Sequence, residues 1–91
     1  MEKGLEIFDE VLKMQMEGTK TIISRVCKPH GDTYYALKQK VALFNKMWGV
    51  VICLYTQNLL TDEEVNDCMV LINEASNSMY IEGMGIETTK D

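Results

Sequence analysis

The 91-residue sequence has few of the residues that interrupt helices or build covalent and metal centres: one proline, six glycines, one histidine and three cysteines. A single proline permits long helices. An odd number of cysteines at irregular spacing does not make a disulfide framework. One histidine and three scattered cysteines also fall short of a spaced zinc motif. We therefore expect no metal, no cofactor and no disulfide-built scaffold.

Long hydrophobic runs are also missing. The longest run, Met47–Tyr55, has nine residues, whereas a membrane-spanning helix needs about 20. The sequence starts with Glu2, Lys3 and Gly4 after the first methionine and has no apolar segment of a secretory signal peptide there. We expect one cytoplasmic domain with little room for an enclosed substrate cavity.

Charge is distributed unevenly along the chain. Residues 1–18 hold five acids and two lysines, a net charge of −3. Residues 19–56 hold six bases and one acid, a net charge of +5, and residues 57–91 hold eight acids and one lysine, a net charge of −7. The chain is therefore acidic, then basic, then acidic, and its total of −5 argues against general nucleic-acid binding.

The first predicted helix covers residues 3–27, because Leu5, Phe8, Val11 and Leu12 recur at helical spacing. Gly18 interrupts this pattern, so the helix either continues through Gly18 or breaks there. Residues 19–27 are rich in β-branched side chains, which also suit a strand. Helix is favoured there because no second strand nearby offers a partner.

The second predicted helix covers residues 33–59, after a break at 28–32 and an N-cap at Asp32 or Thr33. Its apolar side chains recur at spacings of three and four, which predicts a core stripe with Trp48 buried at its centre. In the second half the apolar arc widens beyond what an ordinary surface helix needs. Gly49 and Cys53 leave a notch of small residues for close approach of another backbone. The stripe consists of Tyr34, Leu37, Val41, Phe44, Trp48, Val51 and Tyr55.

The third predicted helix covers residues 62–82 and begins with a capping box between Thr61 and Glu64. Gly83 is expected to end it, and residues 83–91 are expected to form a flexible C-terminal tail. The predicted fold is therefore an all-α, three-helix arrangement with a long central helix, in a single helical domain at residues 1–82. The wide apolar arc of the second helix also predicts a helical homodimer. The core stripe of the third helix consists of Val65, Cys68, Met69, Ile72, Ala75 or Ser76, and Met79.

Three groups of residues suggest chemistry, and each has a simpler interpretation. Cys27 and His30 have the spacing of a metal knuckle, but Cys53 and Cys68 fall in apolar helical stretches and are expected to be buried small residues. His30 is expected to be a solvated turn residue.

Paired acids give the first alternative function. Glu6 with Asp9, and Glu64 with Asp67, each share a helix face. Two such helices facing each other can hold Mg²⁺, as all-α nucleotide pyrophosphohydrolases do. The chain would then be a metal-dependent nucleotide hydrolase, although Glu64 is already explained by its cap.

The basic middle of the chain gives the second alternative, a nucleic-acid-binding regulator, since lysines can contact phosphates while Tyr34 and Tyr35 stack on bases. We favour internal charge complementarity between adjacent helices, because the flanking segments are acidic.

The function we predict is a small acidic, non-enzymatic protein–protein interaction module. It would act as an inhibitor, adaptor or regulator of a larger partner with a basic surface, a profile common among small inhibitors from phages and mobile elements. The predicted partner-binding residues are Asp62, Glu63, Asp67 and Glu74, at the start of the third helix and on its outward side, because these acids are not needed for the apolar stripe.

Overall fold

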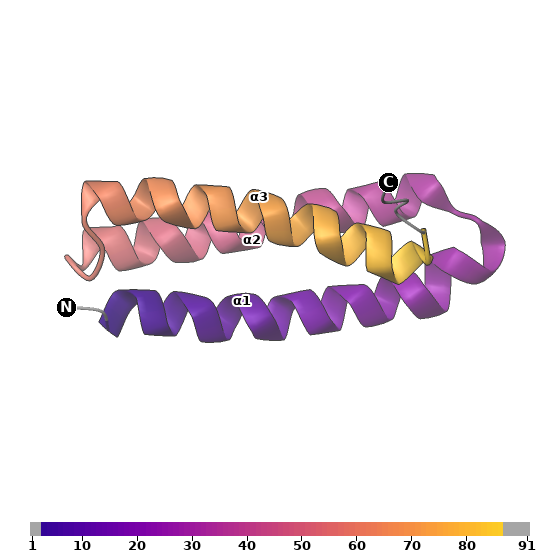
Figure 1. Cartoon of the computed structure of the whole chain (residues 1–91), viewed down its shortest axis with the longest axis horizontal. Coiled ribbons are helices and arrows are strands. Elements are labelled where there is room, and N and C mark those ends of the chain that lie inside the picture. Colours follow the sequence, from indigo (N-terminus) through magenta and orange to yellow (C-terminus); the bar gives the residue numbers. More distant parts are fainter. Residues whose placement is uncertain (1–2, 87–91) are drawn as a thin grey trace, which may run out of the picture.

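The computed structural model describes residues 3–86, which form helices and turns and contain no strand. Three long helices, α1 (Lys3–Ile22), α2 (Thr33–Thr56) and α3 (Asp62–Met84), follow one another in alternating directions (Figure 1). Each helix packs against both of the others, so the predicted all-α arrangement with a long central helix is confirmed. No helix in this range is long and apolar enough to cross a membrane.

The break that the sequence had left open at Gly18 does not occur. The first helix continues through Gly18 to Ile22, passes into a π-helical turn at Ile23–Cys27 and ends in a short 3-10 turn at Lys28–His30. The helical assignment of residues 19–27 is therefore confirmed. A glycine inside a helix costs about 1 kcal/mol, which the burial of Ile23 and Cys27 in the core offsets.

Side-chain caps fix where α2 and α3 begin. Asp32 accepts a hydrogen bond from the backbone N–H of Tyr35 at 3.0 Å. Thr61 Oγ1 accepts from the N–H of Glu64 at 3.1 Å, and Glu64 Oε1 accepts from the N–H of Thr61 at 2.9 Å. The predicted N-cap of α2 and the predicted capping box of α3 are both confirmed.

The end of α3 differs from the prediction by two residues. The helix runs through Gly83 to Met84, and Gly85 ends it with a left-handed φ of 72°. Residues 83 and 84 are therefore helical, and residues 87–91 of the predicted tail lie outside the described range.

Gly83 lies inside α3, and its lack of a side chain lets the helix pass very close to the π-helical turn. A Cβ atom at position 83 would lie 2.8 Å from Cγ2 of Ile23, too near for an ordinary contact. The predicted notch at Gly49 admits no other backbone among residues 3–86, since a Cβ atom at position 49 would meet no atom of these residues outside its own stretch of helix within 4 Å. Cys53, predicted to be buried, is also exposed.

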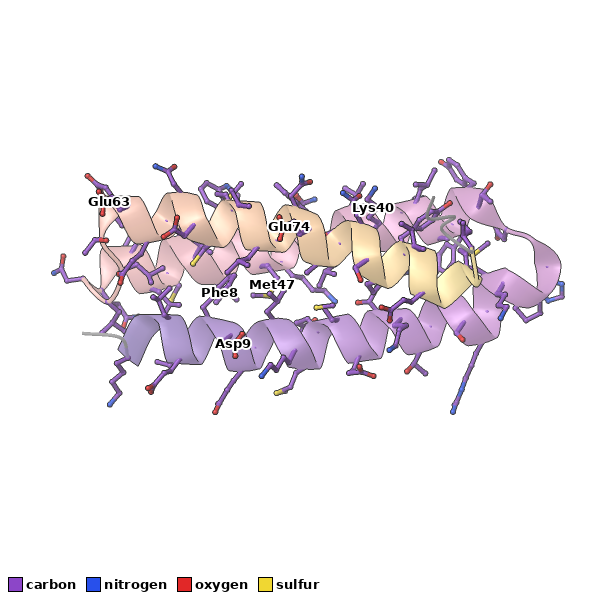
Figure 2. The ribbon with its side chains drawn as sticks, viewed as in Figure 1. Phe8, Asp9, Lys40, Met47, Glu63 and Glu74 are labelled. Carbon is purple, nitrogen blue, oxygen red and sulfur yellow. The ribbon has the colours of Figure 1, made fainter. Side chains whose placement is uncertain are left out.

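The core lies where the three helices meet, and Figure 2 shows Phe8 of α1 and Met47 of α2 pointing into this space. Most core side chains are aliphatic or contain sulfur. The buried hydrophobic residues are Phe8, Leu12, Ile23, Cys27, Ala36, Leu43, Met47, Val51, Leu54, Leu60, Cys68, Ile72, Ala75 and Met79. The predicted core stripe of α3 is thus confirmed at Cys68, Ile72, Ala75, Ser76 and Met79.

The predicted burial of Trp48 at the centre of the domain is wrong. Trp48 is 36% exposed, whereas its neighbour Met47 is fully buried. Helix α2 carries two apolar stripes of similar period, and the stripe with the smaller and more flexible side chains faces the core. The inward residues of α2 are Ala36, Leu43, Met47, Val51 and Leu54.

Candidate functional site

The predicted acids of α3 divide into two groups. Glu63, Asp67 and Glu74 are exposed and lie on one side of the helix, because their spacings of four and seven residues return to the same face. Figure 2 marks Glu63 near the start of α3 and Glu74 near its middle. Two aliphatic residues, Val70 and Leu71, sit between these acids and are 57% and 45% exposed. We call these five residues the acidic face.

Asp62 belongs to a different surface. Its carboxylate accepts a hydrogen bond of 2.6 Å from the hydroxyl of Tyr55 in α2. This bond, together with the negative charge of Asp62, raises the pKa of Tyr55. The contact ties the beginning of α3 to the end of α2, so the structure does not group Asp62 with the outward acids.

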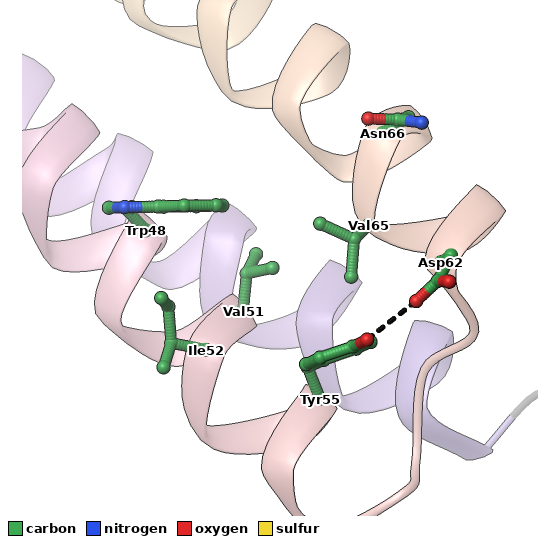
Figure 3. A pocket seen from close by; sticks show the side chains of 7 residues that line it. All are labelled: Trp48, Val51, Ile52, Tyr55, Asp62, Val65 and Asn66. Atoms are coloured by element: carbon green, nitrogen blue, oxygen red, sulfur yellow. Dashed lines mark hydrogen bonds between the residues drawn. The ribbon is translucent and has the colours of Figure 1, made fainter.

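The Tyr55–Asp62 contact closes one end of a groove between α2 and α3 (Figure 3). The groove has a volume of about 340 Å³, at the lower end of the range for small-ligand pockets. Its walls are mainly apolar, with Asp62 and Asn66 as polar groups. The lining residues are Trp48, Val51, Ile52, Tyr55, Asp62, Val65 and Asn66.

The groove is one end of an apolar stripe that follows the whole of α2. Tyr34, Val41, Trp48 and Tyr55 are spaced by seven residues, which is the repeat of a helix–helix seam. A second series lies three residues after each of the first three positions and consists of Leu37, Phe44 and Val51. We call these seven residues the heptad stripe.

Most of the heptad stripe is uncovered. Tyr34 is 72% exposed and Val41 56% exposed, while Leu37 and Tyr55 are each 45% exposed. Only Val51 is fully buried. The sequence prediction found these residues but assigned them to the core. Their unbroken seven-residue spacing is typical of a helix–helix seam.

Two of the three lysines of α2, Lys38 and Lys40, have aromatic neighbours rather than acidic ones. Lys38 Nζ lies 5.3 Å from the centre of the Tyr34 ring, and Lys40 Nζ lies 5.6 Å from that of Tyr80. Between residues 3 and 86 the one ion pair that joins two helices is Lys20–Glu82, at 3.4 Å. The favoured charge complementarity between helices is therefore found at Lys20 alone, and α2, which contains no acid, keeps a basic surface.

The acids considered for Mg²⁺ binding do not come together in a cluster. Asp9 pairs with Lys13 at 3.3 Å along α1, and Glu64 is engaged in the capping box. Within the described part of the chain, no three His, Cys, Asp or Glu side chains are close enough to hold one metal ion.

The cysteines are free thiols in different environments. Burial is the main cause that raises the pKa of Cys27, with a smaller contribution from Asp32. Burial, assisted by the charges of Glu64 and Asp67, raises the pKa of Cys68 to about 11. An activated nucleophile needs a lowered thiol pKa, so these two positions are unsuited to that role.

Comparisons with family models, curated proteins and solved structures found no match to this chain.

Proposed function

We propose that this protein is a small acidic, non-enzymatic protein–protein interaction module. It acts as an inhibitor, adaptor or regulator of a larger partner with a basic surface. The partner docks on the acidic face of α3. Asp62, which the sequence prediction grouped with this surface, is left out because Tyr55 engages its carboxylate.

The observation that carries this proposal is the pairing of charge with uncovered apolar surface on α3. Glu63, Asp67 and Glu74 surround the exposed side chains of Val70 and Leu71. Two adjacent exposed aliphatic residues on the same helix face as three acids support a contact with another protein. A protein partner uses both, since apolar contacts contribute affinity while charges steer association and fix orientation.

The proposed module is a cytoplasmic homodimer. Three free thiols suit a reducing compartment. The heptad stripe of α2 leaves an apolar seam that a second helix can cover, and this seam lies on a different helix from the acidic face.

The test begins with affinity capture of partners from the native host, identified by mass spectrometry. The triple variant Glu63→Lys, Asp67→Lys and Glu74→Lys should bind the captured partner at least tenfold more weakly, mainly through a slower association rate. The wild-type complex should weaken as salt rises, because exposed charges are screened.

A matched control uses three exposed acids of α1. Glu6→Lys, Asp9→Lys and Glu10→Lys also replace two glutamates and one aspartate, so the net charge changes equally on another surface. This control should bind within about twofold of wild type. If both triple variants bind like wild type, the acidic face is not the docking surface. Salt-sensitive binding of labelled DNA or RNA, or Mg²⁺-dependent nucleotide turnover, would favour the two alternative functions.

A further inference from the structure

The heptad stripe exposes an apolar surface as large as the largest patch of a typical monomer, and such patches are often functional. A whole aromatic side chain offers about 150–250 Å² and an aliphatic one less, so the exposed fractions of the stripe and of Ile52 leave on the order of 500 Å² uncovered. A patch of this size marks an interaction site. Two copies that cover each other would remove on the order of 1,000 Å², which reaches the range of specific interfaces.

The occupant of the stripe must itself present an apolar edge with the same seven-residue repeat, because side chains of two packed helices interlock only when their repeats match. A second copy of α2 meets this requirement by identity. No acid lies within Thr33–Thr56, so the contact area contains no carboxylate from α2 that would need a buried partner.

The order of large and small residues selects an antiparallel pairing. When two α2 helices run in opposite directions and are centred between residues 42 and 43, each level joins one aromatic and one aliphatic side chain. Tyr34 then faces Val51, Leu37 faces Trp48, and Val41 faces Phe44. A parallel pairing in register would instead put each aromatic residue against itself. Alternation of large and small side chains packs better.

We infer that a second copy of this chain binds antiparallel along α2, so that Tyr34 of each copy lies over the groove of the other. The floor of that groove is Val51, and its walls include Trp48, Ile52 and Tyr55. The Tyr34 side chain is 72% exposed and contributes little to the fold of its own copy, so it is available to enter a groove. This inference rests on the homodimer in the proposed function and adds its interface and its direction.

The first test is the molecular mass of the intact chain by light scattering and sedimentation at micromolar concentrations. Wild type should have twice the 10.4 kDa mass of one copy. Tyr34→Ala should raise the dissociation constant of the dimer at least tenfold without changing the helical circular dichroism spectrum. The matched control is Tyr35→Ala, which removes the neighbouring tyrosine from a position outside the stripe and should change the constant less than twofold.

The direction of pairing can be measured without any substitution, because Cys53 is the exposed cysteine while Cys27 and Cys68 are buried. A spin label on Cys53 should report a distance between copies of about 30 Å, since the two positions would be 21 residues apart along the paired helices at about 1.5 Å per residue. In a parallel pair the two labels would be separated only laterally, by about 10–20 Å.

A monomer at these concentrations, a dimer that tolerates Tyr34→Ala, or a Cys53 distance below 20 Å would each overturn the inference. None of these results bears on partner binding by the acidic face, because that face lies on α3 and the heptad stripe lies on α2. The two proposals can therefore fail separately.

Discussion

The inner and outer sides of α2 are both apolar, but they differ in the kind of residue they use. The inner side consists of alanine, valine, leucine and methionine, which fill the space between three closely packed helices. The outer side carries Trp48 and the tyrosines at positions 34 and 55, all partly or largely exposed. Aromatic residues of this kind are enriched in protein interfaces and their hot spots. One side of α2 therefore builds the domain, and the other is available for association.

The largest expected effect contrasts two adjacent residues, Met47 and Trp48. Met47→Ala should lower the free energy of unfolding by about 2–5 kcal/mol, because it empties a fully buried site. Trp48→Ala should cost about 1–2 kcal/mol, since its side chain already contacts solvent. Both are measured by urea unfolding in a Tyr34→Ala background, which separates folding from association. A larger loss for Trp48→Ala than for Met47→Ala would contradict the assignment of the two sides.

The next largest changes in stability are expected at two glycines, one in the packed region of α3 and one on the outer part of α2. Gly83→Ala should destabilise by about 1–3 kcal/mol, because its Cβ would lie 2.8 Å from Ile23. Gly49→Ala should stabilise by about 0.5–1 kcal/mol, because nothing lies within 4 Å of its Cβ and alanine favours helix. Thermal unfolding measures both. A Gly83→Ala variant as stable as wild type, or more stable, would show that α3 does not pack on the π-helical turn as described.

The smallest perturbation uses the native thiols as reporters of the two regions. At pH 8 a disulfide reagent should modify Cys53 quickly and should modify Cys27 and Cys68 more slowly by at least about 100-fold, because burial and a raised pKa both suppress their thiolates. The folded pKa of Cys68, about 11, lies above the ordinary thiol value of 9.0. Its contribution to stability is therefore present below pH 9 and is lost as the pH rises toward 11. Rapid modification of all three thiols would place the buried pair at the surface.

Local signals in the sequence predicted much of this architecture. The turn at Asp32 and the pairing of Thr61 with Glu64 depend on residues three positions apart, so the helix starts could be placed without tertiary information. The stripe of α3 was also predicted correctly at its buried positions, because Cys68, Ile72 and Met79 recur at helical spacing.

The orientation of α2 could not be predicted in the same way. Two stripes at helical spacing satisfy the same periodicity, and only packing against α1 and α3 decides which one turns inward. The residues around Trp48 were assigned to the core because they recur at spacings of three and four along the helix. Similarly, the break considered at Gly18 does not occur, because the free energy gained by burying Ile23 exceeds the helix penalty of one glycine. The groove was missed because it forms between residues of two helices.

The most direct test of the central claim is the emission of Trp48 in a dilution series. Trp48 is the single tryptophan and lies in the heptad stripe, so it reports the outer side of α2 alone. We expect Trp48 to emit at shorter wavelength in the dimer and to shift toward the value of exposed tryptophan as the dimer dissociates, while the helical signal stays unchanged. Emission that stays constant across concentrations over which the mass falls from two copies to one would contradict pairing through this stripe.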